Sequence, residues 1–153
     1  MWQFKAKQKI FEIGKAKIGG VPGERPVVLI GTLFHLGHKI VTDAKKGDFD
    51  KARAEELINI QDEFSDKTGN PCMIDLVASG PDAVSKELEF VMSVTDAPIL
   101  IDPVGAEAKK TAIQYIKENN LTDNVVYNSI TVETKQEELD LIKEAGITSA
   151  ILL

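Results

Sequence analysis

Two aspartates and one asparagine stand at the ends of short apolar runs in this 153-residue chain. They are Asp75, Asp102 and Asn128, and intervals of 27 and 26 residues separate them along the sequence. A carboxylate accepts two parallel N–H bonds, whereas a carboxamide both donates and accepts. With no basic residue beside them, these groups suit a neutral ring with adjacent N–H donors, such as a pterin, better than a phosphate.

The three apolar runs predict parallel β-strands. Each run is continuous rather than alternating and follows a helical pattern, which is typical of strands buried on both faces. Parallel strands deliver their carboxyl ends to the same edge of a sheet, where ligands bind in βα folds. We therefore expect Asp75, Asp102 and Asn128 to face one crevice, although a single aspartate at a strand end is more often a turn residue or a helix cap.

The same spacing predicts the fold class, an α/β protein with a parallel βα repeat. We expect strands at residues 26–32, 72–75, 98–102, 124–128 and 150–153, with helices between them, and a β-hairpin at residues 4–19 that turns at Gly14. A repeat of roughly 26 residues predicts about eight units in a closed TIM barrel. Residues 1–153 are thus expected to form a single incomplete domain, the amino-terminal half of a barrel with about five strands. The alternative is a complete, open, doubly wound sheet.

Cap residues and apolar stripes define the predicted helices. Asp50 and Gly69 are expected to cap the first helix, and Thr134 with Glu137 has the spacing of a capping box for the last one. The first helix is predicted to face inward through an apolar stripe. The residues of that stripe are Ala54, Leu57, Ile58 and Phe64.

Composition argues against several classes of protein. The net charge of −6, with acidic and basic residues interleaved, is atypical of nucleic-acid binding. The single Cys72 cannot form an internal disulfide, which fits a reducing, cytoplasmic setting. No apolar run approaches the roughly 20 residues of a membrane helix, so we expect no direct membrane insertion.

Residues 33–49 are the longest stretch without clear periodicity, and they hold both histidines, His35 and His38. A long loop at the carboxyl end of a strand is a place for a substrate-covering lid or a partner-facing surface, although a tolerated insertion is equally common. Two histidines without a neighbouring cysteine or glutamate are a weak metal motif, so we expect no metal site in this chain.

Three further motifs carry a family resemblance. They are Thr68-Gly69-Asn70-Pro71, Thr95-Asp96-Ala97-Pro98 and Tyr127-Asn128-Ser129-Ile130. Together with the strands around them, they resemble the MtrH family of tetrahydromethanopterin S-methyltransferase subunits and the related tetrahydrofolate methyltransferases, over the whole chain. The resemblance implies a TIM barrel of the pterin-binding type, about twice as long as this chain.

The resemblance also implies an activity. The N5-methyl group of methyl-tetrahydromethanopterin, or of methyl-tetrahydrofolate, would pass to the cobalt of a corrinoid (cobalamin) held by a partner subunit. Asp75, Asp102 and Asn128 would bind the pterin, with Asn128 and Asp102 as the catalytic residues. Pro103 departs from the pattern, because a small hydroxyl residue is expected after Asp102.

The same resemblance implies partners and a location. These are a corrinoid-carrying subunit, a homo-oligomer or a second half of the barrel, and a cytoplasmic position at the periphery of a membrane complex. The alternative function is a truncated, non-catalytic half barrel that acts as a docking or interaction subunit.

Overall fold

A five-stranded parallel sheet forms the centre of the computed structural model, which describes residues 5–152. Its strands, in spatial order, are β3 (Leu29–Leu33), β6 (Cys72–Ala78), β7 (Ile99–Pro103), β8 (Val125–Ile130) and β9 (Ser149–Ile151). The connecting helices are α1 (Lys51–Thr68), α2 (Pro81–Val94), α3 (Ala106–Glu118) and α4 (Gln136–Ala145). Phe4 and Leu153, predicted in the hairpin and in the last strand, lie outside the described residues.

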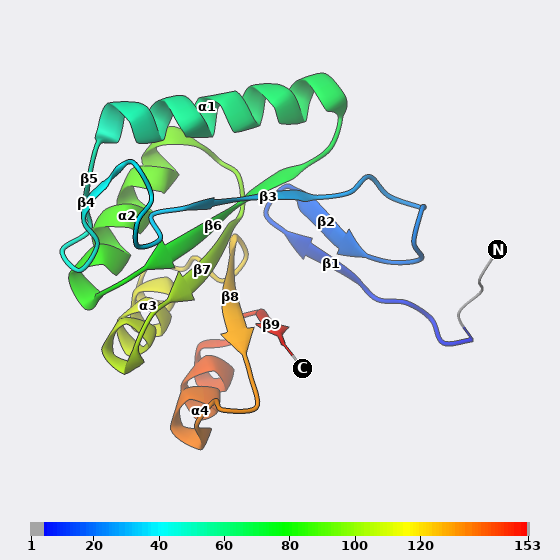
Figure 1. The fold of residues 1–153 in the computed structure, drawn as a ribbon. Coiled ribbons are helices and arrows are strands. Elements are labelled where there is room, and N and C mark those ends of the chain that lie inside the picture. The colour runs from blue at the N-terminus through cyan, green and yellow to red at the C-terminus, as the bar shows by residue number, and fades with distance from the viewer. Residues whose placement is uncertain (1–4, 153) are drawn as a thin grey trace.

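The helices cover one face of the sheet, and the strands fan out so that the other face is concave (Figure 1). Strand residues whose side chains point away from the concave face pack with the helices in one large apolar core. They include Ile74, Leu76, Ile99, Ile101 and Tyr127. This arrangement confirms the α/β fold class and is consistent with one half of a TIM barrel. In the part of the chain that the structure describes, no helix has the length and apolarity needed to span a membrane.

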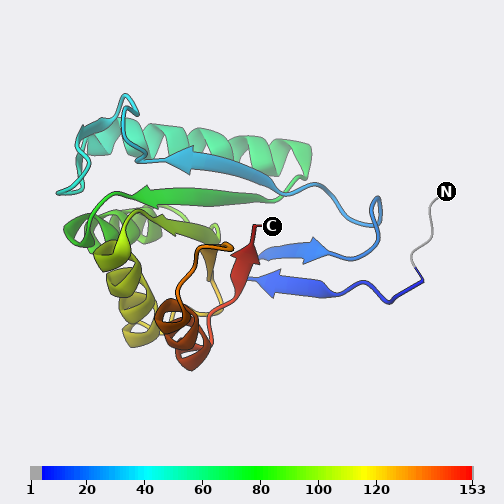
Figure 2. The ribbon, with the colours of Figure 1, turned by 60° about the horizontal axis from the view of Figure 1, so that its bottom comes forward.

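A β-hairpin closes the concave face at the amino-terminal ends of the strands, as Figure 2 shows. Its strands are β1 (Ile10–Ile13) and β2 (Ala16–Gly19), and Gly14 lies in the predicted turn with a positive φ. Gly14 N–H donates to the carbonyl of Asp123, and Lys15 pairs with Asp96. A second apolar cluster joins the hairpin to the sheet, through Ile13, Ala16, Met73 and Val126.

The segment between β3 and α1 is more ordered than its sequence pattern predicts. It contains a small antiparallel pair, β4 (Val41–Asp43) and β5 (Asp48–Phe49). Phe34 is fully buried with φ +66°, and its ring centroid lies 4.6 Å from that of Phe49, which lies 4.9 Å from that of Phe90 on α2. Aromatic packing therefore anchors this long connection to the helix layer.

Two of the three predicted caps are confirmed and one is wrong. The Asp50 carboxylate accepts from Arg53 N–H at 3.1 Å, and Gly69 ends α1 in the left-handed region. The capping box at Thr134 does not form, since α4 begins at Gln136 and Thr134 Oγ1 accepts from Thr131 N–H instead. The hydroxyl of Thr134 is therefore hydrogen-bonded within the loop after β8 and does not cap the helix.

The predicted apolar stripe of α1 is half wrong. Ala54 and Ile58 are buried, but Leu57 and Phe64 are 40% and 56% exposed. The row facing the sheet continues with a polar residue, Gln61, whose amide donates to the carbonyl of Met73 at 2.9 Å. At this position a hydrogen bond to the strand, rather than hydropathy, decides which side chain faces the sheet.

Candidate functional site

The three predicted site residues lie on the concave face of the sheet. The residue two positions before each of them packs in the cluster beneath the hairpin, and these residues are Met73, Leu100 and Val126. Because side chains alternate along a strand, Asp75, Asp102 and Asn128 project to the same side, nearer the carboxyl ends of the strands. The hairpin cluster thus forms an apolar floor below a polar layer.

The three residues are not level with one another, which corrects one detail of the prediction. Asp75 lies in the middle of β6 and pairs in register with Leu100, whereas Asp102 pairs with Val77. Asp75 therefore lies two residues deeper in the sheet than Asp102. The predicted strand end at Asp75 was wrong because residues 76–78 are apolar and continue the ladder with β7.

The Asp75 carboxylate is held from two sides. Thr32 Oγ1 on β3 donates to Asp75 Oδ2 at 3.0 Å, and Asn128 Nδ2 on β8 donates to Asp75 Oδ1 at 3.3 Å. Thr32 was not among the predicted site residues, although its place at the end of the first predicted strand could have indicated it. The structure therefore joins three strands of the sheet through one carboxylate.

Asp102 lies half-buried beside this group. Burial is the main cause that raises the pKa of its carboxyl, and the negative charge of Asp75 adds to the effect. The ammonium group of Lys109, in the first turn of α3, acts in the opposite direction. The charges of Asp75 and Lys109 thus act on the pKa of Asp102 in opposite directions.

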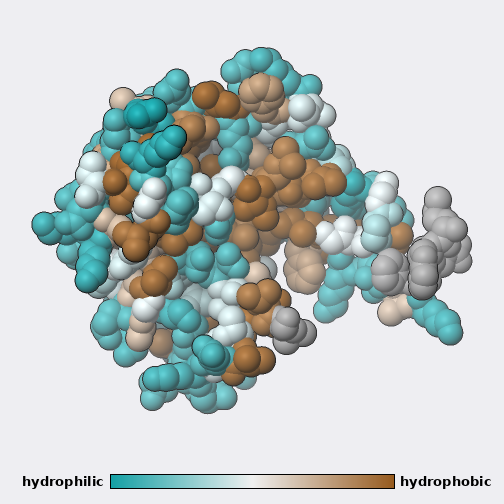
Figure 3. Space-filling view, in the orientation of Figure 1, coloured by the Kyte–Doolittle hydropathy of each residue, from teal (hydrophilic) through white to brown (hydrophobic). Residues whose placement is uncertain are grey.

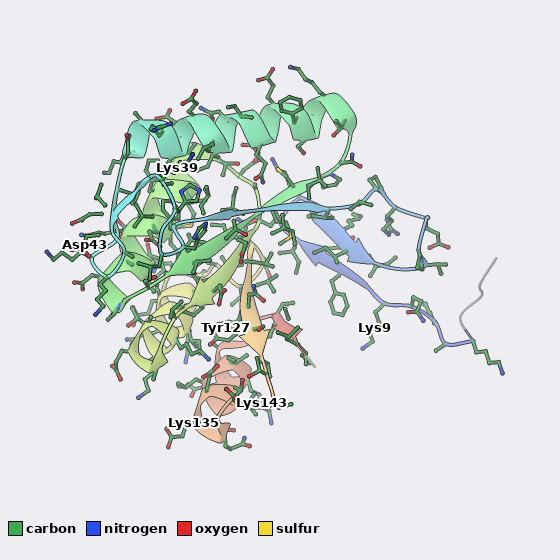
Figure 4. The ribbon with its side chains drawn as sticks, viewed as in Figure 1. Lys9, Lys39, Asp43, Tyr127, Lys135 and Lys143 are labelled. Atoms are coloured by element: carbon green, nitrogen blue, oxygen red, sulfur yellow. The ribbon has the colours of Figure 1, made fainter. Side chains whose placement is uncertain are left out.

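A hydrogen-bonded group lies behind β8, on the helix side of the sheet. Tyr127 is fully buried, and its hydroxyl donates to Glu138 Oε1 at 2.8 Å. The ammonium of Lys109 donates to both carboxylate oxygens of Glu138, at 3.1 and 3.2 Å. Figure 4 shows Tyr127 on β8 beside α4, the helix that carries Lys143 and follows Lys135. Sequence reasoning missed Glu138 and Lys109, because no local pattern pairs α3 with α4.

Among the described residues, the two histidines make hydrogen bonds only within their own loop and none to the site carboxylates. Their ring centroids are 5.0 Å apart in an edge-to-face arrangement, and both line a groove between their loop and the outer face of α1, together with Arg53 and Leu57. Burial and the neighbouring His35 lower the pKa of His38. In Figure 4, Lys39, a residue of the same loop, lies near α1. A role of His35 and His38 in a lid or a partner contact stays a prediction.

Over residues 5–152, no cluster of three or more His, Cys, Asp or Glu side chains is arranged to hold a metal ion. The carboxylates of the concave face are instead arranged as hydrogen-bond acceptors, with Asp75 already accepting from two neutral donors. The arrangement suits a ligand with several N–H groups and no strong charge.

Comparison with known families matches residues 6–153 to the model of the tetrahydromethanopterin S-methyltransferase MtrH subunit. The chain belongs to the MtrH family. The corresponding tetrahydromethanopterin S-methyltransferase subunit of Methanopyrus kandleri is 46% identical over 147 residues, which are 96% of this chain and 46% of that protein. The corresponding subunit of Methanothermobacter thermautotrophicus is 44% identical over 153 residues, which are 100% of this chain and 49% of that protein.

Similarity extends to a relative with a different name. A subunit of the putative methyltransferase mtx of Methanosarcina mazei is 39% identical over 153 residues, with 100% of this chain and 49% of that protein covered. The chain spans about half the length of the curated relatives it matches. These matches confirm the family resemblance that the motifs indicated.

Proposed function

We propose that this chain binds a methylated tetrahydropterin on its concave face and contributes to the transfer of the N5-methyl group to a corrinoid protein. One observation carries the proposal. In this member of the MtrH family, Asp75, Asp102 and Asn128 share one face of the sheet, and Asn128 donates a hydrogen bond to Asp75. The names of the relatives, as tetrahydromethanopterin S-methyltransferase subunits, support the substrate class.

The polar groups fit the pyrimidine edge of a pterin. A carboxylate offers about four lone-pair positions, and Asp75 uses two of them for Thr32 and Asn128. Two remain for the amino group and ring nitrogen of the ligand. Ionised Asp102 would accept a further N–H from the same edge, and the apolar floor beneath would contact the ring face.

Asn128 and Asp102 are the catalytic residues in this proposal, because both would touch the ring whose nitrogen loses the methyl group. A tertiary amine leaves poorly unless a donor hydrogen-bonds to it as the C–N bond breaks. Asn128 Nδ2 has a second N–H beyond the one given to Asp75, and this group would serve as that donor. Asp102 would hold the ring so that N5 faces Asn128.

The proposal includes partners and a cofactor. The corrinoid of a partner subunit would supply the cobalt that accepts the methyl group, so this chain contributes pterin contacts and no metal ligands. The methyl carrier would be tetrahydromethanopterin or tetrahydrofolate. Residues 1–153 would form the amino-terminal half of one barrel domain, with its hairpin at residues 4–19, in a cytoplasmic protein at the periphery of a membrane complex.

The proposal is tested by calorimetric titration of N5-methyl-tetrahydromethanopterin into the chain. Asp75→Ala, Asp102→Ala and Asn128→Ala should each weaken binding by roughly tenfold or more, since each removes a hydrogen bond to the ring or to another site residue. Asp66→Ala, an exposed aspartate at the end of α1, is the matched control and should bind like the wild type. A folded wild-type chain that gives no binding heat would refute the proposal.

A second function, that of a docking subunit, has one observation in its favour. Large apolar side chains remain exposed at both edges of the sheet, and Figure 3 shows hydrophobic residues gathered between the sheet and the hairpin. The exposed apolar side chains at the two edges are Val27, Leu29 and Ile30 in or beside β3, and Ile151 and Leu152 in or beside β9. Exposed apolar edges favour association. Absence of pterin binding together with self-association in sedimentation would favour this function.

A further inference from the structure

A groove beside the first half of α1 takes no part in the proposed pterin contacts. It has a volume of about 550 Å³ and lies between the helix and the loop that follows β3. The loop contributes His35, His38 and Lys39, and the helix contributes Arg53, Leu57 and Ile60. Because the loop leaves the carboxyl end of β3 and α1 begins there, the groove lies toward the same edge of the sheet as the candidate site (Figure 1).

Cations without an intrachain partner line this groove. Over residues 5–152, eight lysines form ion pairs with carboxylates, but the side chains of Lys39 and Arg53 form none. Among the described residues that line the groove, only Glu56 is acidic. Two fixed cations thus face one carboxylate, in a chain whose net charge is −6. The groove therefore favours acidic groups, which the chain as a whole repels.

His38 adds a hydrogen-bond donor to the groove. Its Nδ1 accepts from Ile40 N–H at 3.4 Å, so the neutral ring carries its hydrogen on Nε2. Burial is the main cause that lowers the pKa of His38, which keeps the ring neutral near pH 7. Within the described chain, no hydrogen bond uses the Nε2 atom. This N–H group is free to donate to an incoming carboxylate.

An apolar stripe on α1 continues the groove. Leu57, Ile60 and Phe64 are each exposed by 40% or more. Their spacing of three and four residues places them on one side of the helix, over about 10 Å. Leu36 of the loop is 82% exposed. Exposed apolar side chains gathered beside an arginine are typical of protein contacts.

We propose that this groove docks an acidic amphipathic helix of a partner protein. Carboxylates of that helix would pair with Arg53 and Lys39, and its apolar side would cover Leu57, Ile60 and Phe64. The inference goes beyond the proposed function and does not depend on it, because no residue of the groove belongs to the pterin site. A partner docked here would lie beside the edge of the sheet where methyl transfer is proposed.

The charges and the shape of the groove favour this occupant over others. A small anion would contact the cations and leave the apolar stripe exposed. An anionic membrane or a nucleic acid would meet a chain of net charge −6, and only two fixed cations lie in the groove. An acidic helix with one apolar side satisfies both the cations and the stripe.

Two synthetic helical peptides of about 15 residues test the proposal. One carries leucines on one side and glutamates on the other, and the second has lysine in place of each glutamate. Fluorescence anisotropy should show that the chain binds the acidic peptide at least about tenfold more tightly than the basic one. The affinity for the acidic peptide should fall as the salt concentration rises.

Arg53→Glu should weaken binding of the acidic peptide by about tenfold or more, because it reverses the charge beside the groove. A glutamate is favourable in the first turn of a helix, so this variant should keep its fold, which circular dichroism checks. Lys51→Glu is the matched control. Lys51 lies in the same turn of α1 but lines a different groove, beside β5, and its substitution should leave the affinity near that of the wild type.

Three results would overturn the inference. The first is equal binding of the two peptides, or an affinity that Arg53→Glu does not change. The second is absence of peptide binding together with binding to phosphatidylglycerol vesicles that Arg53→Glu removes, which would assign the groove to a membrane surface. The third is self-association in sedimentation that the same substitution removes, without peptide binding, which would assign the groove to a second copy of the chain.

Discussion

Asn128 donates a hydrogen bond to Asp75, although their positions differ by 53 residues and strand β7 lies between their own strands. In a flat sheet, neighbouring strands are about 4.8 Å apart. Residues on two strands with another strand between them are therefore normally too far apart for direct contact. The contact exists because the sheet is curved and the side chains of its concave face converge. Curvature thus assembles the site.

Thr32 should matter for ligand binding more than for stability. Thr32→Val removes the hydroxyl that donates to Asp75, while the exposed position tolerates the methyl group. We expect pterin affinity to fall by about threefold to tenfold, because the Asp75 carboxylate loses one of the two hydrogen bonds that orient it. Calorimetry measures this, with Thr42→Val on β4 as an exposed control. Equal affinities of both variants and the wild type would contradict the role of Thr32.

Asp75 should control the ionisation of Asp102. The Asp75 charge raises the pKa of Asp102, so Asp75→Asn should lower that pKa by removing the like charge while keeping the side-chain shape. Carbon NMR of the carboxyl groups across roughly pH 2–8 measures the change, and Asp123→Asn near the hairpin turn is the control. An Asp102 titration that does not move would mean that the Asp75 charge does not contribute to the raised pKa.

Glu87 should make the chain less stable as the pH rises. It is 1% exposed on α2, its Oε2 has no hydrogen-bond partner among the described residues, and burial raises the pKa of its carboxyl to about 8. Below the unfolded-state pKa, near 4.5, Glu87 is protonated in both the folded and the unfolded chain, so its ionisation does not affect the free energy of unfolding. Above it, ionisation favours the unfolded chain until the folded pKa is reached.

Glu87→Gln should therefore remove this pH dependence. We expect its free energy of unfolding to exceed that of the wild type by roughly 2–4 kcal/mol at about pH 8, and to match it near pH 4. Urea denaturation at several pH values measures this, and the exposed Glu55→Gln on α1 is the control. A difference that stays constant across this pH range would show that Glu87 does not hold a proton in the folded chain.

Phe34 should be essential for the connection between β3 and α1. Phe34→Ala removes a buried ring from the cluster with Phe49 and should cost about 3–5 kcal/mol of unfolding free energy. Phe64→Ala, on the exposed side of α1, should cost less than about 1 kcal/mol. Denaturant unfolding of both variants measures the contrast. Similar losses would show that the cluster contributes little.

The regular features of the fold could be predicted from local sequence. Continuous apolar runs roughly 26 residues apart indicated parallel strands, and Asp50, Gly69 and Gly14 marked a helix start, a helix end and a turn. These signals are local, because each depends on the conformation of a few consecutive residues. The placement of Asp75, Asp102 and Asn128 on one face of the sheet followed from the same reasoning, since parallel strands share a direction.

The remaining features depend on which elements meet. The apolar residues 76–78 are compatible with a longer strand, but pairing with β7 decides that β6 continues to Ala78. The placement of Gln61 against the sheet and the failure of the Thr134 cap were likewise decided by long-range or loop hydrogen bonds. The sequence by itself determined the repeat and indicated the three polar residues of the candidate site. Only the tertiary structure decided that Thr32 joins them and that Lys109 lies behind them, because curvature and helix packing bring together groups that no local pattern links.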